Sequence, residues 1–172
     1  MELKYIALTD ALYRYLVKCR SHTSDPVLES LRRETDALGD ISKMQISAEQ
    51  GSFMSLLAAA VGAKSAIEVG TFTGYSSICI ARGLSQNGRL LCIDESKEWT
   101  DIAQKYWREA GVSQRIELRL GPAVPLLQKL EPELTFDFVF IDASKTEYDA
   151  YYELLLPRVR SNGLILFDNM RP

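Results

Sequence analysis

From Ala63 onward the chain alternates short, almost continuously apolar runs with segments of helical character, and no other feature constrains the fold so strongly. The apolar runs read SAIEVG, RLLCID, RIELRL, FDFVFID and GLILFD. Helical segments lie between them at about 75–84, 98–110, 123–130 and 147–159. Strands this apolar need cover on both faces, which is typical of parallel sheets flanked by helices. The alternation therefore predicts a doubly wound α/β fold with a mostly parallel sheet.

Residues 1–45 precede this alternation and have helical patterns of their own. In ELKYIALTDALYRYLVKCR the apolar residues recur at roughly helical spacing. A second helix is expected to begin at Ser24 or Asp25, either of which can cap it, with Pro26 in the first turn. A third begins at Ser47, and Gln50 gives it the spacing of a capping box. No linker or repeat is evident, so we expect one domain over residues 1–172 with a helical preface at 1–45.

Net charge and rare residue types limit the classes of function. A formal net charge of -3 gives no reason to expect a nucleic acid partner. The only histidine, His22, excludes a His-rich zinc site. Cys19, Cys79 and Cys92 are odd in number and scattered, which is typical of reduced cysteines and not of a disulfide framework. No run has transmembrane length or the form of a secretory signal, so we expect a soluble, cytoplasmic protein without a membrane partner.

The first strand ends in EVGTFTGYSS, and ligands of open α/β sheets bind beyond such strand ends. Gly70 and Gly74 permit a tight turn at which a ligand can approach backbone N–H groups. Their G-x-x-x-G spacing differs from the dinucleotide fingerprint and disfavours an NAD-dependent dehydrogenase, the competing enzyme class. Glu68 would repel a phosphate and favour a cationic ligand. The alternative is a turn that needs glycine for its geometry alone.

The second and third strands also end in candidate ligand-binding residues. Asp94 closes the second strand, where an acid commonly accepts the ribose hydroxyls of a nucleoside cofactor. A helix-capping role is an equally good interpretation of Asp94 taken alone. Gly121–Val124 follow the third strand as a compact loop whose backbone can contact a flat base. That loop is a weak signal by itself.

Asp142 ends the fourth strand, and Asp168 and Asn169 end the fifth. Three oxygen ligands at neighbouring strand ends suit a hard cation such as Mg²⁺ or Ca²⁺, with water or substrate at the remaining positions. Lys145 lies three residues beyond Asp142, near the same mouth. The alternative is that the acids cap helices and that Lys145 is a solvated charge.

Taken together, these segments resemble the cation-dependent class I O-methyltransferases that use S-adenosylmethionine, which include catechol and caffeoyl-coenzyme A O-methyltransferases. The resemblance runs from about Met44 to Asn169 and covers SAEQGSFMSLLAAAVGAKSAIEVGTFTGYSS, AGVSQRIELRLGPAVPLL, FDFVFIDASKTEY and NGLILFDN. It implies a Rossmann-like methyltransferase fold and methyl transfer to a small catechol-like or phenolic acceptor. A methyltransferase for base amino groups is disfavoured, because the fourth strand ends in IDASK and lacks that group's Asn/Asp-Pro-Pro-aromatic motif.

The resemblance also implies a role for each site residue. The cofactor-binding residues would be Ile46, Glu68, Gly70, Thr71, Ser76, Asp94, Ala123 and Asp142. Within that set Asp94 would accept the ribose hydroxyls and Ala123 would contact adenine. Asp142, Asp168 and Asn169 would hold the divalent cation, and Lys145 would act as the general base, with a pKa depressed by the nearby metal.

Two departures from the family pattern carry expectations. The plant-type pattern has an acid at the position of Ser144, so one cofactor contact is expected to be weaker here. The family's chain continues beyond the Asp-Asn pair, so we expect the C-terminal antiparallel strand pair and part of the acceptor pocket to be missing. The strand 164–167 would then be an exposed apolar edge that favours association, for which a homodimer is the expected form. A truncated protein that binds the cofactor without turnover is the alternative to an active enzyme.

Overall fold

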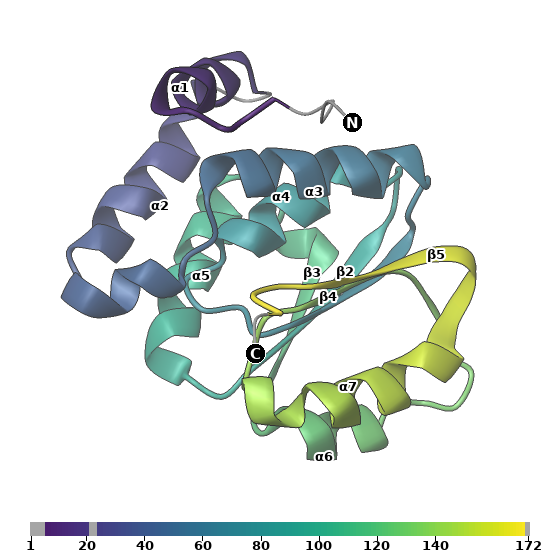
Figure 1. Cartoon of the computed structure of the whole chain (residues 1–172). Helices are drawn as coiled ribbons and strands as arrows, with labels where there is room; N and C mark the ends of the chain where they lie inside the picture. Colours follow the sequence, from purple (N-terminus) through teal and green to yellow (C-terminus); the bar gives the residue numbers. More distant parts are fainter. Residues whose placement is uncertain (1–5, 21–23, 171–172) are drawn as a thin grey trace.

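A computed structural model describes residues 6–20 and 24–170 and contains a five-stranded parallel sheet with helices on both faces (Figure 1). The strand order is β3-β2-β1-β4-β5, and every neighbouring pair is parallel. The strands are β1 (Ser65–Val69), β2 (Arg89–Asp94), β3 (Ile116–Leu120), β4 (Phe136–Ile141) and β5 (Val159–Phe167). The predicted doubly wound α/β fold is confirmed.

Helices α3, α4 and α5 lie on one side of the sheet, and α6 and α7 lie on the other (Figure 1). The α-helices are α1 (Asp10–Cys19), α2 (Pro26–Asp36), α3 (Ala48–Ala60), α4 (Tyr75–Gly83), α5 (Lys97–Glu109), α6 (Ala123–Gln128) and α7 (Tyr148–Leu155). Short 3-10 turns are η1 (Gly39–Met44), η2 (Ser113–Arg115), η3 (Lys145–Glu147) and η4 (Leu156–Arg158). None of the helices within 6–20 and 24–170 is long and apolar enough to cross a membrane.

The predicted starts of the first three helices are mostly confirmed by their caps. The Asp25 carboxylate accepts from the N–H groups of Val27 and Leu28 at 3.1 and 3.0 Å. The Ser47 hydroxyl accepts from the N–H of Gln50 at 3.3 Å, as a capping box requires. The first helix is shorter than its periodicity suggests, because it begins at Asp10 behind Thr9, whose hydroxyl caps it. Residues 2–5 of that predicted helix lie outside the described residues.

The region between α7 and β5 also differs from the prediction. The helix expected over 147–159 ends as α7 at Leu155 and tightens into η4, because Pro157 has no N–H to continue it. β5 begins at Val159, before the apolar run, and its register with β4 shifts between Phe136 and Phe138. Polar residues therefore start this strand, and its apolar run pairs with the end of β4.

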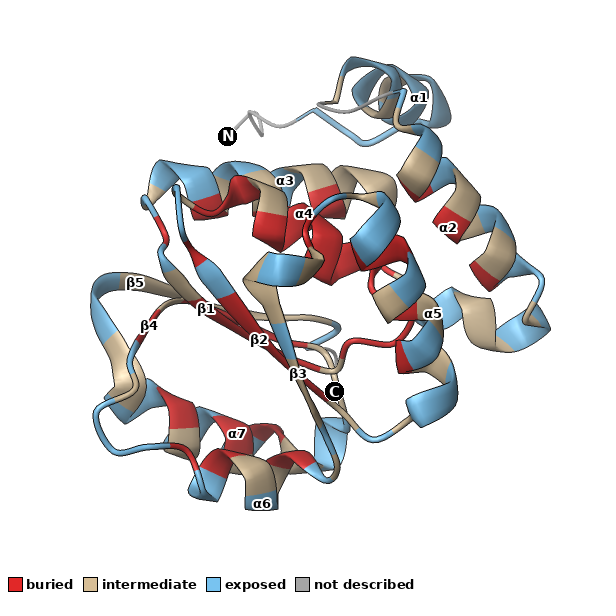
Figure 2. Ribbon diagram, turned by 180° about the vertical axis from the view of Figure 1, so that it is seen from behind, coloured by how far each residue is buried: buried red, intermediate tan, exposed pale blue. Residues whose placement is uncertain are grey.

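Two apolar clusters form the core, one on each face of the sheet (Figure 2). Successive residues of β1 enter opposite clusters: Ala66 packs toward α3 and α4, whereas Ile67 and Val69 pack toward α6 and α7. Cys79 and Cys92 are buried and Cys19 is exposed, and all three are free. Cys79 and Cys92 are therefore core residues and Cys19 is not.

The topology fixes where a ligand can bind. From β1 the chain builds outward to β2 and β3, and it then returns to the other side of β1 to build β4 and β5. The strand order thus reverses between β1 and β4, and in such sheets a crevice opens beyond the carboxyl ends of the strands at that point.

Candidate cofactor and metal site

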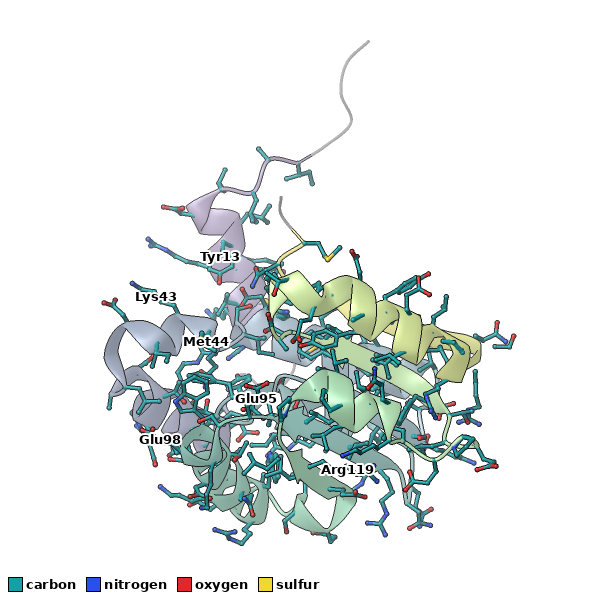
Figure 3. All side chains as sticks on the ribbon, turned by 90° about the horizontal axis from the view of Figure 1, so that it is seen from below. Tyr13, Lys43, Met44, Glu95, Glu98 and Arg119 are labelled. Atoms are coloured by element: carbon teal, nitrogen blue, oxygen red, sulfur yellow. The ribbon has the colours of Figure 1, made fainter. Side chains whose placement is uncertain are left out.

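A cavity of about 560 Å³ opens beyond the carboxyl ends of the strands. One wall is the segment Lys43–Ile46, which we call the strap. The other walls are the glycine turn after β1 (70–74, with Tyr75 and Ser76 of α4) and the loops after β2, β3, β4 and β5. Met44 of the strap and Glu95 of the loop after β2 both line the cavity and lie on the face seen in Figure 3. This volume is typical of a site for a small-molecule cofactor.

The glycine turn needs both of its glycines. Gly70 has a φ of +90°, and a Cβ there would collide with the backbone carbonyl of Asp142. Gly74 has a φ of +87°, and a Cβ there would lie 2.7 Å from Cβ of Ala103 and 2.9 Å from Nε1 of Trp107. The turn therefore runs closer to β4 and α5 than any side chain allows.

Asp94 fastens this turn to the end of β2. Its Oδ2 accepts from the backbone N–H groups of Thr71 and Phe72, each at 2.8 Å, and its Oδ1 accepts from the N–H of Ser96 at 2.8 Å. The N-cap of α5 is Ser96, whose hydroxyl accepts from the N–H of Trp99, so Asp94 itself is not the helix cap. A carboxylate has about four acceptor positions, and three are used here. Room for one direct bond from a ribose hydroxyl remains.

Glu68 lies under the turn and is not part of the cavity wall. It is completely buried in the centre of the sheet, and its Oε2 accepts from the thiol of Cys92 at 3.4 Å. Burial raises the pKa of Glu68 to about 8, although Ser76 and Cys92 beside the carboxyl act in the opposite direction. The expected direct contact of Glu68 with the cofactor stays a prediction. Thr71, directly above it, lines the cavity with a buried hydroxyl that has no hydrogen-bond partner in the described part of the chain.

Asp142 and Asp168 converge at the ends of β4 and β5. Burial raises the pKa of the Asp142 carboxyl above its ordinary value, and the nearby Asp168 carboxylate raises it further, against the opposite effect of Lys145. Asn169, in a left-handed conformation with φ of +53°, donates its backbone N–H to Oδ1 of Asp168 at 2.9 Å. Across the described ranges no group of three or more His, Cys, Asp or Glu could hold a metal. The candidate set is two carboxylates and an amide, a donor set that fits a hard cation.

Lys145 currently supplies the positive charge at this cluster. Its Nζ donates to Oδ1 of Asp142 at 2.8 Å, to the hydroxyl of Tyr148 at 2.5 Å and to the carbonyl of Asp168 at 3.2 Å. Burial lowers the pKa of Lys145, but the bonds to Asp142 and Tyr148 outweigh it, so the net shift is upward. The ammonium form is therefore the stable one in this metal-free arrangement, and the pKa depression expected beside a bound metal stays a prediction.

The structure brings most of the predicted site residues to one cavity. Those that line it are Ile46, Gly70, Thr71, Ser76, Asp94, Ala123, Asp142, Lys145 and Asn169. Ser144 lines it as well, with its hydroxyl 2.9 Å from that of Thr146. Asp168 is absent from the lining but contacts Lys145 through its carbonyl, and Glu68 lies below the surface.

Sequence reasoning missed several residues of the cavity wall. Phe72 and Trp99 form an edge-to-face pair with ring centroids 5.0 Å apart, and both line the cavity. Tyr151 lines it from α7, and its hydroxyl donates to Oε2 of Glu147 at 2.6 Å. Trp99 and Tyr151 lie on helices, where an aromatic residue is normally a core residue. Nothing in the sequence separates them from other aromatic core residues, and only the tertiary structure places them at the cavity beyond the strand ends.

Comparison with known proteins finds relatives that are described as O-methyltransferases. A family model described as O-methyltransferase matches residues 18–171. A probable caffeoyl-CoA O-methyltransferase 2 from Dictyostelium discoideum is 40% identical, and the alignment covers 91% of this chain and 74% of that protein. Caffeoyl-CoA O-methyltransferase 5 from Nicotiana tabacum is 34% identical, with 96% of this chain and 71% of the relative covered.

Solved structures show the same similarity. The crystal structure of the O-methyltransferase from Bacillus cereus in complex with S-adenosylhomocysteine superposes with a TM-score of 0.85 at 35% identity. That alignment covers 92% of this chain and 72% of the other. An O-methyltransferase from Streptomyces achromogenes in complex with S-adenosylmethionine superposes with a TM-score of 0.82 at 29% identity, covering 93% of this chain and 76% of the other.

Proposed function

This chain belongs to the O-methyltransferase family and has S-adenosylmethionine as its methyl donor; from that premise we propose that it methylates a small catechol-like or phenolic hydroxyl with the aid of a divalent cation. The observation that carries the proposal is the convergence of Asp142 and Asp168 around the Lys145 ammonium, beside the glycine turn. The caffeoyl group in the names of the relatives is itself a catechol, which supports this class of acceptor.

The residues at the ends of β4 and β5 fit a divalent cation. The nearby Asp168 carboxylate raises the pKa of Asp142, and the positive charge of Lys145 beside Asp142 acts in the opposite direction, so this carboxylate is stabilised by a cation next to it. Asp142, Asp168 and Asn169 would hold Mg²⁺ or Ca²⁺, whose preferred ligands are oxygens. When bound, such a cation lowers the pKa of a phenolic hydroxyl in contact with it.

We assign Lys145 as the general base that removes the hydroxyl proton of the acceptor. While it is paired with Asp142 it is an ammonium and has no lone pair to offer. If Asp142 held a cation, Lys145 would lose this partner and would have a positive neighbour, and both changes would lower its pKa. Its Nζ can then accept the hydroxyl proton of the acceptor. Tyr148, whose hydroxyl donates to the carbonyls of Ile141 and Asp168 at 3.2 and 3.0 Å, keeps the lysine at the mouth of the cavity.

The remaining residues hold and orient the cofactor. Asp94 has one acceptor position left for a ribose hydroxyl, and Thr71, whose backbone N–H Asp94 holds, lines the cavity. Alignment of acceptor oxygen and methyl group by such a rigid wall removes much of the entropic cost of a two-substrate reaction.

The experiment measures methyl transfer from S-adenosylmethionine to a catechol with Mg²⁺, with Ca²⁺ and with a chelator. We expect turnover that depends on the cation and is lost in Asp168→Asn. The matched control is Asp149→Asn, since Asp149 is an exposed acid on the first turn of α7, away from the ion pair. Binding of S-adenosylhomocysteine with cation-independent turnover, or with none in wild type, would refute the proposal.

We also propose that the protein forms a homodimer through its N-terminal helices. α1 has no buried residue and leaves the apolar side chains of Tyr15 and Leu16 exposed, and α3 beside it exposes Phe53 and Leu56 (Figure 2). Exposed apolar side chains on two neighbouring helices favour association. Light scattering across a range of concentrations tests this, and a monomer mass at every concentration contradicts it.

A further inference from the structure

Helix α2 carries two side chains that contact the strap: Thr35 also contacts Thr73 of the glycine turn, and Arg32 also contacts Tyr75, the first residue of α4 after that turn. They are three residues apart and thus on one face of the helix. Neither of them lines the cavity, whereas the strap and the turn that they join form two of its walls. α2 therefore lies behind the site and connects its two sides.

Thr35 makes the first connection through buried hydroxyl groups. Its Oγ1 donates to Oγ1 of Thr73 in the turn at 2.9 Å. The Nε2 of Gln45 in the strap donates to Oγ1 of Thr35 at 3.0 Å and to Oγ1 of Thr73 at 3.2 Å. Thr35 and Thr73 are both fully buried. Because buried polar groups that lose a partner are costly, this triangle strongly favours one position of the strap.

Arg32 makes the second connection one helical turn away. Its Nη2 donates to the backbone carbonyl of Ile46 in the strap at 3.3 Å. Its guanidinium also lies over the ring of Tyr75, 5.0 Å from the centroid, where a cation is attracted to the ring face. Two consecutive strap residues, Gln45 and Ile46, are thus each held by a different α2 side chain.

We propose that Arg32 and Thr35 are positioning residues for S-adenosylmethionine, which fix the spacing between the strap and the glycine turn and so determine how long the cofactor stays bound. This inference rests on the proposed function for its ligand. Ile46 is nearly buried at the edge of the strap, and a strap released from α2 would no longer hold it against a bound cofactor. Lys145 bonds to Asp142, Tyr148 and Asp168, and none of these contacts involves α2.

The test compares Thr35→Val, which removes the hydroxyl but keeps the shape of the side chain, with Thr35→Ser, which keeps the hydroxyl. The probe is S-adenosylhomocysteine, with affinity from calorimetry and dissociation from stopped-flow fluorescence. Loss of the triangle should weaken binding about fivefold to tenfold in Thr35→Val, mostly through faster dissociation. Thr35→Ser should remain within about twofold of wild type. In steady state, KM for S-adenosylmethionine should rise while kcat at saturation stays unchanged.

Thr100→Val is the matched control. Thr100 is as buried as Thr35, and its hydroxyl donates to the carbonyls of Ser96 and Lys97 within α5, away from the strap. Arg32→Met is the second variant, which keeps the inference testable if Thr35→Val does not fold. It should raise the dissociation rate in the same way.

The outcomes separate the positioning role of Arg32 and Thr35 from the assignment of the cofactor. Equal affinities in wild type, Thr35→Val and Arg32→Met overturn the positioning role, and so does an equal loss in Thr100→Val, which would indicate a general effect of stability. A wild-type protein that does not bind S-adenosylhomocysteine refutes the cofactor assignment itself, and the positioning role falls with it. The positioning role is supported if Thr35→Val and Arg32→Met both dissociate faster while Thr35→Ser and Thr100→Val behave like wild type.

Discussion

The substitution Asp94→Asn tests whether this acid is a structural fastener as well as a cofactor ligand. In the structure the carboxylate accepts three backbone N–H groups, from Thr71, Phe72 and Ser96, all at 2.8 Å. An asparagine can keep its single oxygen toward Thr71 and Phe72, but its amide nitrogen then meets the N–H of Ser96. The turn thus keeps two weaker bonds and loses the third.

The magnitude follows from those three bonds. Hydrogen bonds to a charged group contribute about 1.5 kcal/mol each at a partly exposed site, and neutral ones about half of that. Two weakened bonds and one lost bond therefore lower the free energy of unfolding by about 3 kcal/mol. Urea denaturation of the cofactor-free protein measures this directly, so that any effect on binding stays out of the result.

Asp101→Asn is the matched control for the loss of an acid. Asp101 is exposed and pairs with Lys97 four residues earlier in α5, an interaction that contributes about 0.3–0.5 kcal/mol. Calorimetry with S-adenosylhomocysteine should then show binding lost in Asp94→Asn and retained in Asp101→Asn. If Asp94→Asn unfolds within about 0.5 kcal/mol of wild type, the fastening role is wrong and only a ligand role remains.

Three further predictions test other parts of the site. Gly70→Ala should destabilise the protein by more than Gly111→Ala, because both glycines have positive φ but only a Cβ at Gly70 meets the Asp142 carbonyl, while nothing lies within 4 Å of Gly111; equal unfolding free energies would contradict the close approach. Glu68 has a pKa raised to about 8 by burial, so its contribution to stability is complete below the unfolded pKa of about 4.5 and declines as pH rises toward 8, with a slope approaching 1.4 kcal/mol per unit; chemical denaturation at several pH values should show this slope in wild type and not in Glu68→Gln. Lys145→Ala should reduce methyl transfer by about a hundredfold or more while leaving the affinity for S-adenosylhomocysteine nearly unchanged, with the exposed Lys129→Ala as control; a parallel loss of binding would show that Lys145 holds the cofactor instead.

Glu68, directly before the glycine turn, is buried in the core of the sheet. Burial raises the pKa of Glu68 to about 8, so the neutral form predominates at lower pH, and its Oε1 has no hydrogen-bond partner among the described residues. Helices cover both faces of the sheet, so a side chain of β1 enters the core whichever face it is on. Strand alternation decides the layer, because Glu68 shares a face with Ala66, whereas Ile67 and Val69 face the other layer.

The sequence by itself determined the sheet and the place of the site. The five apolar runs are the five strands, and the strand-terminal residues Asp94, Asp142 and Asp168 gather at one edge, because parallel strands all end on the same side. These features are encoded in local periodicity, which a single segment carries on its own. The helix starts at Asp25 and Ser47 were readable for the same reason.

The tertiary structure alone decided which groups meet within that site. Thr35 and Thr73 are 38 residues apart, and Gln45 and Thr73 are 28 apart, yet their side chains form one buried triangle. The use of three acceptor positions of Asp94 by backbone, and the upward shift in the pKa of Lys145, likewise depend on neighbours that come from other elements. Such contacts have no periodic signal, since they arise only when packing brings distant segments within hydrogen-bonding distance.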